Sequence, residues 1–303
     1  MANRVGTNGQ DIFNLVSDAA AEHGLQDDRI TAGAGFDAIS TGAGNDFLDG
    51  GAGFDTLVDG DGDDTVHGGS GDDFVYVDAG NDLYFGGSGT DWLNFQKIHY
   101  GPFGGEDNYN GIKLDLASTK AQDLGEFGID QFFGFENVIT GYGNDTIFGS
   151  ADANFISNRG GSDLLDGREG NDTLIGGSDG DTLIGGLGKD SINAANGATD
   201  SFRDVVRYES LKDSGTTGAT WDEIFQFTKG QDKIDLSKID ANLGLKGNQA
   251  FKVVKGFTKA FGEVKLVKSG TDTIVQVDGD KDSAIDMTFW VYGVHLSKSD
   301  FIL

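Results

Sequence analysis

One spacing dominates this chain: an aspartate recurs every nine residues, with an apolar side chain two positions after it. Between residues 32 and 94 these aspartates are Asp37, Asp46, Asp55, Asp64, Asp73, Asp82 and Asp91. Glycines precede each one, so the segment consists of seven nonapeptides of the form Gly-Gly-x-Gly-x-Asp-x-apolar-x. Six more units fill residues 140–193, with Asp145, Asn154, Asp163, Asp172, Asp181 and Asp190 at the aspartate position. A lone unit at 6–14 and a degenerate one at 23–31 extend the array, which predicts a repeat architecture.

The glycines and the apolar positions together predict the shape of each repeat. Glycine takes positive φ at no steric cost, so each nonapeptide is expected to turn sharply and then form a short strand. Two nonapeptides complete a coil of eighteen residues, and stacked coils form two parallel sheets that enclose the apolar side chains. We therefore predict an all-β fold, a parallel β-roll. Its core would contain Ile39, Leu48, Leu57, Val66, Val75 and Leu93, followed by Ile147, Ile156, Leu165, Leu174, Leu183 and Ile192.

Stacking also places every second aspartate on the same edge of the roll. Carboxylates this close repel one another unless a cation lies between them. Ca²⁺ fits, because it accepts six to eight oxygen ligands in flexible geometry, whereas zinc favours cysteine and histidine ligands that this chain lacks or scatters. We predict that the metal ligands come from the repeat aspartates and the turn glycines. They are Asp37, Asp46, Asp55, Asp64, Asp73, Asp82, Asp91, Asp145, Asp163, Asp172, Asp181 and Asp190, with Gly51, Gly53, Gly69, Gly71, Gly177 and Gly186.

These nonapeptides resemble those of the RTX (haemolysin-type) family of secreted calcium-binding proteins, whose repeats form a parallel β-roll. The resemblance implies several bound Ca²⁺ ions. A glycine-rich disordered tract is the alternative, but it predicts no regular apolar position. Some units depart from the pattern: Asn154 replaces an aspartate, which puts the calcium site on that edge in question, and in another unit Val77-Asp78 replaces the two leading glycines.

Charge divides the chain in two. Residues 1–200 hold 8 basic and 35 acidic residues, while residues 201–303 hold 14 and 15. We therefore predict a β-roll domain at 1–200, with a metal-free interruption at about 95–139, and a β-rich cap and secretion domain at 201–303. So dense a negative charge destabilises a compact state, and we expect the roll to be largely unfolded without calcium. The formal net charge of −28 also argues against nucleic acid as a partner.

Outside the repeats the pattern is weaker. Residues 111–116 and 130–139 alternate as strands do, and the interruption resembles the wide, metal-free coils of RTX rolls. A separate inserted domain is the less favoured reading, because so short a cysteine-free segment would make a marginal core. Residues 222–237 predict a strand, a turn and the start of a short helix. They closely resemble the segment after the repeats in serralysin-type metalloproteases and alginate epimerase R-modules.

The segment around Asp278-Gly279-Asp280, set between two apolar runs, predicts a hairpin turn. An EF-hand that uses Asp278, Asp280 and Asp282 is the sharper alternative. However, Ser283 stands where that loop needs glycine, and Phe289 stands where it needs a bidentate glutamate. We therefore favour the turn.

The chain closes on Asp300 and three apolar residues, which resembles the uncleaved C-terminal signal of type I secretion substrates. The resemblance implies an extracellular protein and an ABC exporter as a partner. We expect no N-terminal signal peptide, because residues 1–17 lack a basic start and an apolar core. We also expect no transmembrane segment, since no run reaches eighteen apolar residues.

Catalysis is not expected. Relatives with this tail carry a catalytic domain before the repeats, and the chain has no His-Glu-x-x-His. Residues 176–180 match Gly-x-Ser-x-Gly, but Ser178 is in phase with the repeat, which favours a turn. We predict a secreted, non-catalytic module that binds a surface or an acidic polysaccharide. The candidate binding residues are Trp221, Trp290, Lys252, Lys255, Lys259, Lys265 and Lys268, for which ordinary core and solvated strand faces are the alternative. A second hypothesis is an accessory module of a secreted polysaccharide epimerase or metalloprotease.

Overall fold

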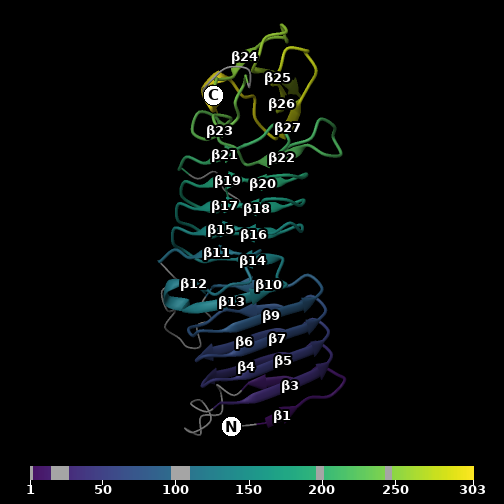
Figure 1. Ribbon diagram of the computed structural model, residues 1–303, viewed down its shortest axis with the longest axis vertical. Coiled ribbons are helices and arrows are strands. Elements are labelled where there is room, and N and C mark those ends of the chain that lie inside the picture. The colour runs from purple at the N-terminus through teal and green to yellow at the C-terminus, as the bar shows by residue number, and fades with distance from the viewer. Residues whose placement is uncertain (1–2, 15–26, 97–109, 196–200, 243–247) are drawn as a thin grey trace. The chain divides into compact units, whose positions relative to one another are not determined.

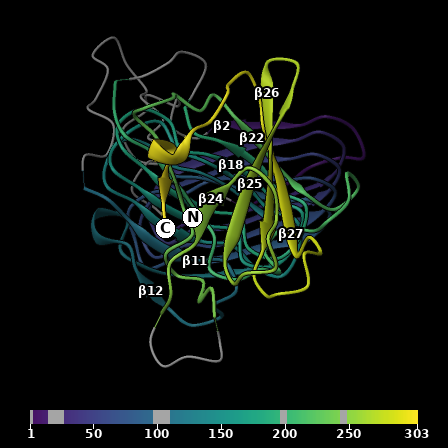
Figure 2. The same ribbon diagram turned by 90° about the horizontal axis from the view of Figure 1, so that it is seen from above.

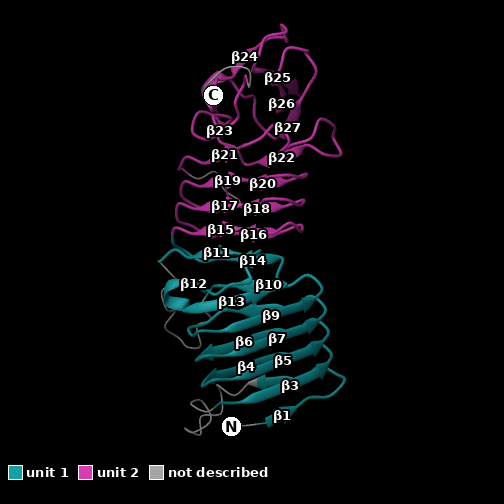
Figure 3. Cartoon of the chain, viewed as in Figure 1, with its two compact units in different colours: residues 1–143 teal, residues 144–303 magenta. Residues whose placement is uncertain are grey.

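The computed structural model describes residues 3–14, 27–96, 110–195, 201–242 and 248–303. The chain separates into two compact units, residues 1–143 and 144–303 (Figure 3). Within the described ranges the helical elements are two short 3-10 turns, η1 (Gly125–Phe127) and η2 (Lys298–Asp300). No helix in those ranges has the length and apolarity needed to cross a membrane. The predicted all-β class is confirmed.

In residues 3–14 and 27–94 of the first unit the strands alternate between two sheets (Figure 1). One sheet has the order β1-β3-β5-β7-β9-β13-β12, and the other contains β2-β4-β6-β8-β10-β14. The bounds are β1 (Asn3–Val5), β2 (Ile12–Asn14), β3 (Arg29–Ala34), β4 (Ala38–Ala43), β5 (Phe47–Ala52), β6 (Thr56–Asp61), β7 (Thr65–Ser70), β8 (Phe74–Tyr76), β9 (Leu83–Ser88), β10 (Trp92–Asn94), β11 (Lys113–Asp115), β12 (Gln122–Asp123), β13 (Ile129–Phe133) and β14 (Asn137–Ile139). Among the described pairs in this unit, only β12 with β13 is antiparallel.

The register of these sheets confirms the eighteen-residue coil. Leu48 of β5 pairs with Val66 of β7, and Leu57 of β6 pairs with Val75 of β8. All four side chains are fully buried. Burying a residue of this size stabilises the fold by about 1.5–3 kcal/mol relative to leaving it in water. All the other predicted core residues in both units are buried as well.

The interruption joins the stack with a wider coil. Its predicted strands are present as β11, β13 and β14, and β13 pairs in parallel with β9, where Phe132 lies opposite Tyr84. Aromatic rings fill the enlarged core: Tyr84 and Phe132 stack at 5.2 Å, and Phe95 meets Phe127 edge-on at 5.3 Å. Residues 97–109 of the interruption, and part of the degenerate repeat at 23–31, lie outside the described residues. That the interruption binds no calcium stays a prediction.

The second unit also has two series of strands. One series has the order β15-β17-β19-β21-β23-β28, and the other has the order β16-β18-β20-β22-β27-β26-β25-β24. The bounds are β15 (Thr146–Phe148), β16 (Phe155–Ser157), β17 (Leu164–Asp166), β18 (Thr173–Ile175), β19 (Thr182–Ile184), β20 (Ser191–Asn193), β21 (Val205–Arg207), β22 (Asp222–Phe225), β23 (Lys233–Asp235), β24 (Lys252–Val254), β25 (Glu263–Ser269), β26 (Asp272–Asp278), β27 (Met287–Val291) and β28 (Phe301–Ile302). Parallel pairing continues past residue 200, since Ile192 pairs with Ile224 and Val206 with Ile234. The domain boundary near 200 stays a prediction.

The end of the second unit changes from coils to antiparallel strands. β25, β26 and β27 lie side by side (Figure 2), and Val275 of β26 pairs with Phe289 of β27, which confirms the predicted hairpin. The short helix predicted near residue 237 is wrong, because turns follow β23 there. The Asp235 carboxylate accepts a hydrogen bond from the Ser237 amide at 2.9 Å. Such a local bond offers the backbone an alternative to the helix.

Candidate calcium sites

The turn glycines bring successive coils into close backbone contact. Gly51 and Gly53 have φ of 104° and 134°, a region that L side chains rarely adopt. A Cβ on Gly51 would lie 2.0 Å from the Gly33 carbonyl oxygen, and one on Gly53 would lie 1.5 Å from that of Gly35. The same conformation recurs at the other predicted glycines, Gly69, Gly71, Gly177 and Gly186. These six positions therefore favour glycine, although Arg168 holds a positive φ of 73° at the same position of another repeat. The carbonyl groups of these turns are candidate ligands.

The repeat aspartates of the first unit form two columns, as predicted. In one column the amide of each aspartate donates to Oδ1 of the aspartate eighteen residues later: Asp37 to Asp55 at 2.8 Å, Asp55 to Asp73 at 2.9 Å, and Asp73 to Asp91 at 2.8 Å. The other column links Asp46 to Asp64 at 2.5 Å and Asp64 to Asp82 at 2.7 Å. Each aspartate directly precedes a strand, so the stacking of the strands sets the spacing of the carboxylates.

The second unit repeats this arrangement. Asp145 donates to Asp163 at 2.7 Å and Asp163 to Asp181 at 2.9 Å. In the neighbouring column Asn154 donates to Asp172 at 2.7 Å, and Asp172 donates to Asp190 at 2.9 Å. Asn154 thus keeps the column geometry but brings no charge to it.

In Asp82 and Asp145 the second carboxylate oxygen accepts a hydrogen bond, from Tyr84 and Asn158, but in the other repeat aspartates it is buried and has no hydrogen-bond partner within the protein. This holds for Oδ2 of Asp37, Asp55, Asp64, Asp73, Asp91, Asp172 and Asp190. Burial, reinforced by the charges of neighbouring carboxylates, raises the pKa of Asp73 to about 7 and that of Asp64 to about 8. A buried charge is costly unless it is paired or coordinates a metal. The columns therefore favour a bound cation.

The first glycine of the nonapeptide leaves room for that cation. A Cβ on Gly68 would lie 2.5 Å from Oδ2 of Asp73, and one on Gly185 would lie 2.2 Å from Oδ2 of Asp190. The space beside each unpartnered oxygen is thus bounded by backbone carbonyls and carboxylates, the hard oxygen donors that Ca²⁺ prefers. The residues present fit calcium.

One carboxylate that the sequence analysis missed joins these sites. Asp59 is fully buried, and oxygens of Asp59, Asp64 and Asp82 lie within 4.8 Å of one another. Burial, followed by the charges of Asp64 and Asp82, raises the pKa of Asp59 well above its usual range. Its sequence signal was an acidic residue at the leading-glycine position of a repeat.

Both columns of the first unit run on into the interruption, which the sequence analysis also missed. The Asp82 amide donates to Asp130 Oδ1 at 2.9 Å, and the Asp91 amide donates to Glu136 Oε2 at 2.8 Å. In the second unit Asp181 donates to Asp204, and Asp204 to Asp232, both at 3.0 Å. An apolar residue stands two positions after Asp130, Asp204 and Asp232, as in the repeats. This Asp-x-apolar spacing was the sequence signal that could have placed these three aspartates in the columns.

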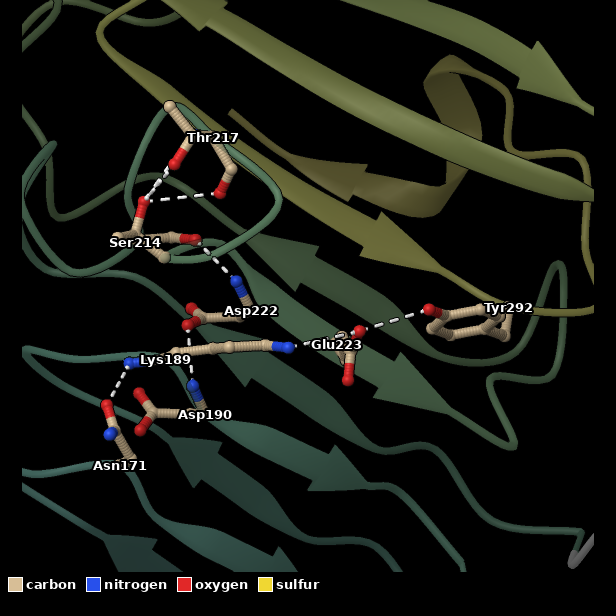
Figure 4. Close-up of polar contacts among 9 residues, drawn as sticks. Asn171, Lys189, Asp190, Ser214, Thr217, Asp222, Glu223 and Tyr292 are labelled. Atoms are coloured by element: carbon tan, nitrogen blue, oxygen red, sulfur yellow. Dashed lines mark hydrogen bonds and ion pairs between the residues drawn. The ribbon is translucent and has the colours of Figure 1, made fainter. Parts of the chain in front are cut away.

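The last column ends on a neutral group (Figure 4). The Asp190 amide donates to Asp222 Oδ1 at 2.9 Å, and the Asp222 amide donates to the hydroxyl of Ser214 at 2.8 Å. Beside it, Lys189 Nζ lies 3.4 Å from Glu223 Oε1, which also accepts a hydrogen bond from Tyr292 at 3.1 Å. At this coil Glu223 thus has partners from the protein itself, Lys189 and Tyr292.

Ser178, which matches the Gly-x-Ser-x-Gly pattern, lies in a turn of the stack. Its amide and its hydroxyl both donate to the Arg159 carbonyl, at 3.0 and 3.2 Å. Ser178 therefore links two neighbouring coils through hydrogen bonds.

Aspartate columns over a parallel roll define a calcium-binding repeat protein, and the comparisons with known proteins agree. The RTX calcium-binding nonapeptide repeat matches residues 24–57 and 58–93. Peptidase M10 serralysin C terminal matches residues 110–303, and the chain belongs to that family. Its RTX repeats form a calcium-binding β-roll that holds several Ca²⁺ ions.

Individual relatives are similar over parts of the chain. Serralysin of Photorhabdus sp. (strain Az29) is 38% identical over 106 residues, which are 33% of this chain and 20% of that protein. The chain thus spans about a fifth of that relative's length. Two solved structures, both from the Azotobacter vinelandii mannuronan C5-epimerase, are also similar. The AlgE6R2 subunit matches at 24% identity, over 55% of this chain and 92% of its own, with a TM-score of 0.25; AlgE6R3 matches at 25%, over 52% and 77%, with a TM-score of 0.20.

Proposed function

We propose that this is a secreted, non-catalytic calcium-binding protein whose roll folds on extracellular calcium. The observation that carries the proposal is the set of stacked carboxylates whose second oxygen is buried and unpartnered. Without a cation the stacked carboxylates of each column repel one another. A Ca²⁺ ion between them would attract both neighbours instead. The test is far-UV circular dichroism of the full chain in chelator and in millimolar calcium. A strand signal of the same size in both conditions would contradict the proposal.

We further propose that the ligands of these ions are the column aspartates and the carbonyl groups of the turn glycines. Each inner aspartate would serve the ions on both sides of it, because it is hydrogen-bonded to the coil before and the coil after. Asp59 would add a third carboxylate beside Asp64 and Asp82. Calcium-45 equilibrium dialysis of single aspartate-to-asparagine variants tests each assignment.

Export would follow a type I route, with the address in residues 201–303. Membership of the serralysin C-terminal family supports this proposal. A chain passes a narrow exporter unfolded, and low cytosolic calcium would keep the roll in that state. Deleting residues 201–303 should leave the chain in the cytoplasm, while fusing them to a passenger should export it. Secretion of the deleted chain through the same exporter would contradict the proposal.

For the extracellular role we propose binding of an acidic polysaccharide by an aromatic row on β22 and β27. Phe225 stacks on Tyr292 at 4.7 Å, Tyr292 on Trp290 at 5.3 Å, and Trp290 meets Trp221 at 5.6 Å. These side chains are partly exposed, and Lys265 lies on β25, which β26 separates from β27. Sugar rings stack on such surfaces, and lysines would pair with uronate groups. Of the other predicted lysines, Lys252, Lys255, Lys259 and Lys268 are exposed.

A glycan array with and without calcium tests this role. Trp290→Ala should abolish binding to uronate polymers. Phe36→Ala, at a 66% exposed aromatic residue in the first unit, is the matched control and should leave binding unchanged. Equal loss in both variants would rule out the aromatic row.

An accessory role in a secreted metalloprotease or polysaccharide epimerase is the second candidate, favoured by the family match to serralysin C-terminal domains. In that case the module would assist folding and export of a catalytic partner. An exporter gene next to this one with no enzyme gene beside it would favour the first role.

A further inference from the structure

The loop that joins β26 to β27 gathers carboxylates outside the nonapeptides. Oxygens of Asp278, Asp280 and Asp286 lie within 4.8 Å of one another, and Asp282 lies on the same loop. Like charges this close repel one another. Here the chain holds three of them together at the end of a regular hairpin.

One member of this cluster has an oxygen that the protein does not satisfy. Asp278 is fully buried, and its Oδ2 has no hydrogen-bond partner. Its Oδ1 accepts a hydrogen bond from the Asp280 amide at 3.1 Å, and Asp286 Oδ2 accepts one from the Gly279 amide at 2.7 Å. A buried carboxylate oxygen beside two further carboxylates is costly unless a cation lies among them.

The backbone removes one of the two objections to a cation loop here, namely that a serine stands where such a loop needs glycine. Ser283, at the sixth position counted from Asp278, has φ of 68°, the left-handed conformation that glycine usually supplies at that position. Phe289, at the twelfth position, is buried in β27 and brings no ligand, so the loop is not an EF-hand.

We propose that residues 278–286 form a further calcium site, separate from the columns of the roll. Asp278, Asp280 and Asp286 would be its carboxylate ligands, with Asp282, backbone carbonyls and water completing the shell. Ca²⁺ suits such a set, because it takes six to eight oxygens at 2.3–2.6 Å in irregular geometry. Since the loop lacks a bidentate glutamate, we expect an affinity in the range of about 10⁻⁴ to 10⁻³ M typical of extracellular modules. The ion would clamp the β26–β27 hairpin.

The test uses the full chain and two measurements. Calcium-45 equilibrium dialysis counts ions per chain, and hydrogen exchange with mass spectrometry follows the peptide 277–287 as calcium is raised. The variant is Asp278→Asn, which keeps an Oδ1 acceptor for the Asp280 amide and removes the charge. The matched control is Asp240→Asn, because Asp240 Oδ1 accepts amide hydrogen bonds from Asn242 and Gln249 at 2.9 and 3.2 Å, as in a turn of the same kind.

We expect the Asp278→Asn variant to bind one ion fewer than the wild type and to lose the calcium-dependent protection of peptide 277–287. Peptides of the roll should stay protected in this variant, and the Asp240→Asn control should keep both the ion count and the loop protection. An unchanged ion count in Asp278→Asn, or loop protection that persists in it, would overturn the site. Equal protection by magnesium alone at the same concentration would overturn the assignment to calcium.

Discussion

The column aspartates of the nonapeptide coils and some carboxylates of residues 201–303 have pKa values that are shifted in opposite directions. In the coils, burial raises the pKa of Asp73 to about 7, and its Oδ2 finds no partner. In the C-terminal region burial also disfavours the charge of Asp235, but hydrogen bonds from Ser237 and Arg207 outweigh it and hold the pKa below its usual range. Glu263 likewise has a lowered pKa, because the Thr258 hydroxyl and amide donate to it.

The difference shows where calcium is needed. Residues 201–303 hold nearly equal numbers of basic and acidic residues, and Arg207 pairs with Asp235 at 3.1 Å, so we expect much of this region to fold without calcium. Residues 1–200 hold far fewer basic than acidic residues, and most column aspartates keep an oxygen unpartnered within the protein, so we expect them to need an external cation. The loop at Asp278 differs from Asp235 and Glu263, because Asp278, like Asp222 at the end of a column, leaves a buried oxygen unpartnered.

The largest expected effect separates the two regions by removing calcium. In chelator, hydrogen exchange of the strands in residues 32–94 should approach that of an unfolded chain, because charge repulsion is uncompensated there. Strands β25 to β27 should stay protected. Hydrogen exchange with mass spectrometry measures both at once. Equal loss of protection in both regions would show that the C-terminal strands depend on the roll.

A smaller effect is expected from single column positions. Asp73→Ala should remove a ligand of the ions on either side of it and lower the calcium count by more than one. Each lost site costs about 1.4 kcal/mol of stability when calcium is ten times Kd. Asn154→Ala should leave the count nearly unchanged, because Asn154 carries no charge. Isothermal titration calorimetry counts the ions, and equal losses in the two variants would contradict the column assignment.

The pH dependence of the calcium-free protein offers a third comparison. Asp64 and Asp73 have a folded pKa of about 8 and about 7, above the value of about 3.9 for an unfolded aspartate. The folded state therefore binds more protons, so stability falls as pH rises from about 4 to 8. In chelator the roll should gain strand signal on acidification from pH 8 to pH 5. Circular dichroism across that range checks it, and a gain with rising pH would contradict the burial of these groups.

The smallest expected effect concerns a matched pair of glycines. In Gly68→Ala the new Cβ would meet Asp73 Oδ2 at 2.5 Å, whereas in Gly256→Ala it would meet nothing within 4 Å. The first change should destabilise the calcium-bound protein by about 1–3 kcal/mol, as overpacking does, and weaken calcium binding. The second should be nearly neutral. Chemical denaturation in saturating calcium measures both, and similar values would show that the space beside Asp73 is not confined.

Much of the fold could be predicted because each nine-residue repeat encodes the same local structure, one turn followed by one short strand. Each glycine pair permits one turn and each apolar residue points inward, so Leu48 and Leu57 were assigned to the core without any long-range information. The columns of Asp37 and Asp46 followed from the same period. Where the period stops, the prediction weakened: the helix expected near Ser237 is a turn, because a carboxylate two residues earlier captures its amide.

The sequence by itself determined the repeat unit, the core positions and the chemistry of the metal, since these depend on neighbours within nine residues. Only the tertiary structure decided how far the carboxylate columns extend. Asp82 reaches Asp130 across 48 residues, and Asp190 reaches Asp222 across 32, where the eighteen-residue spacing is lost. It also decided that Asp278 is buried with Asp280 and Asp286 close by. The physical reason is that a coil can close wherever its apolar residue can be buried. The number of residues between two such coils can vary, so it does not appear as a period in the sequence.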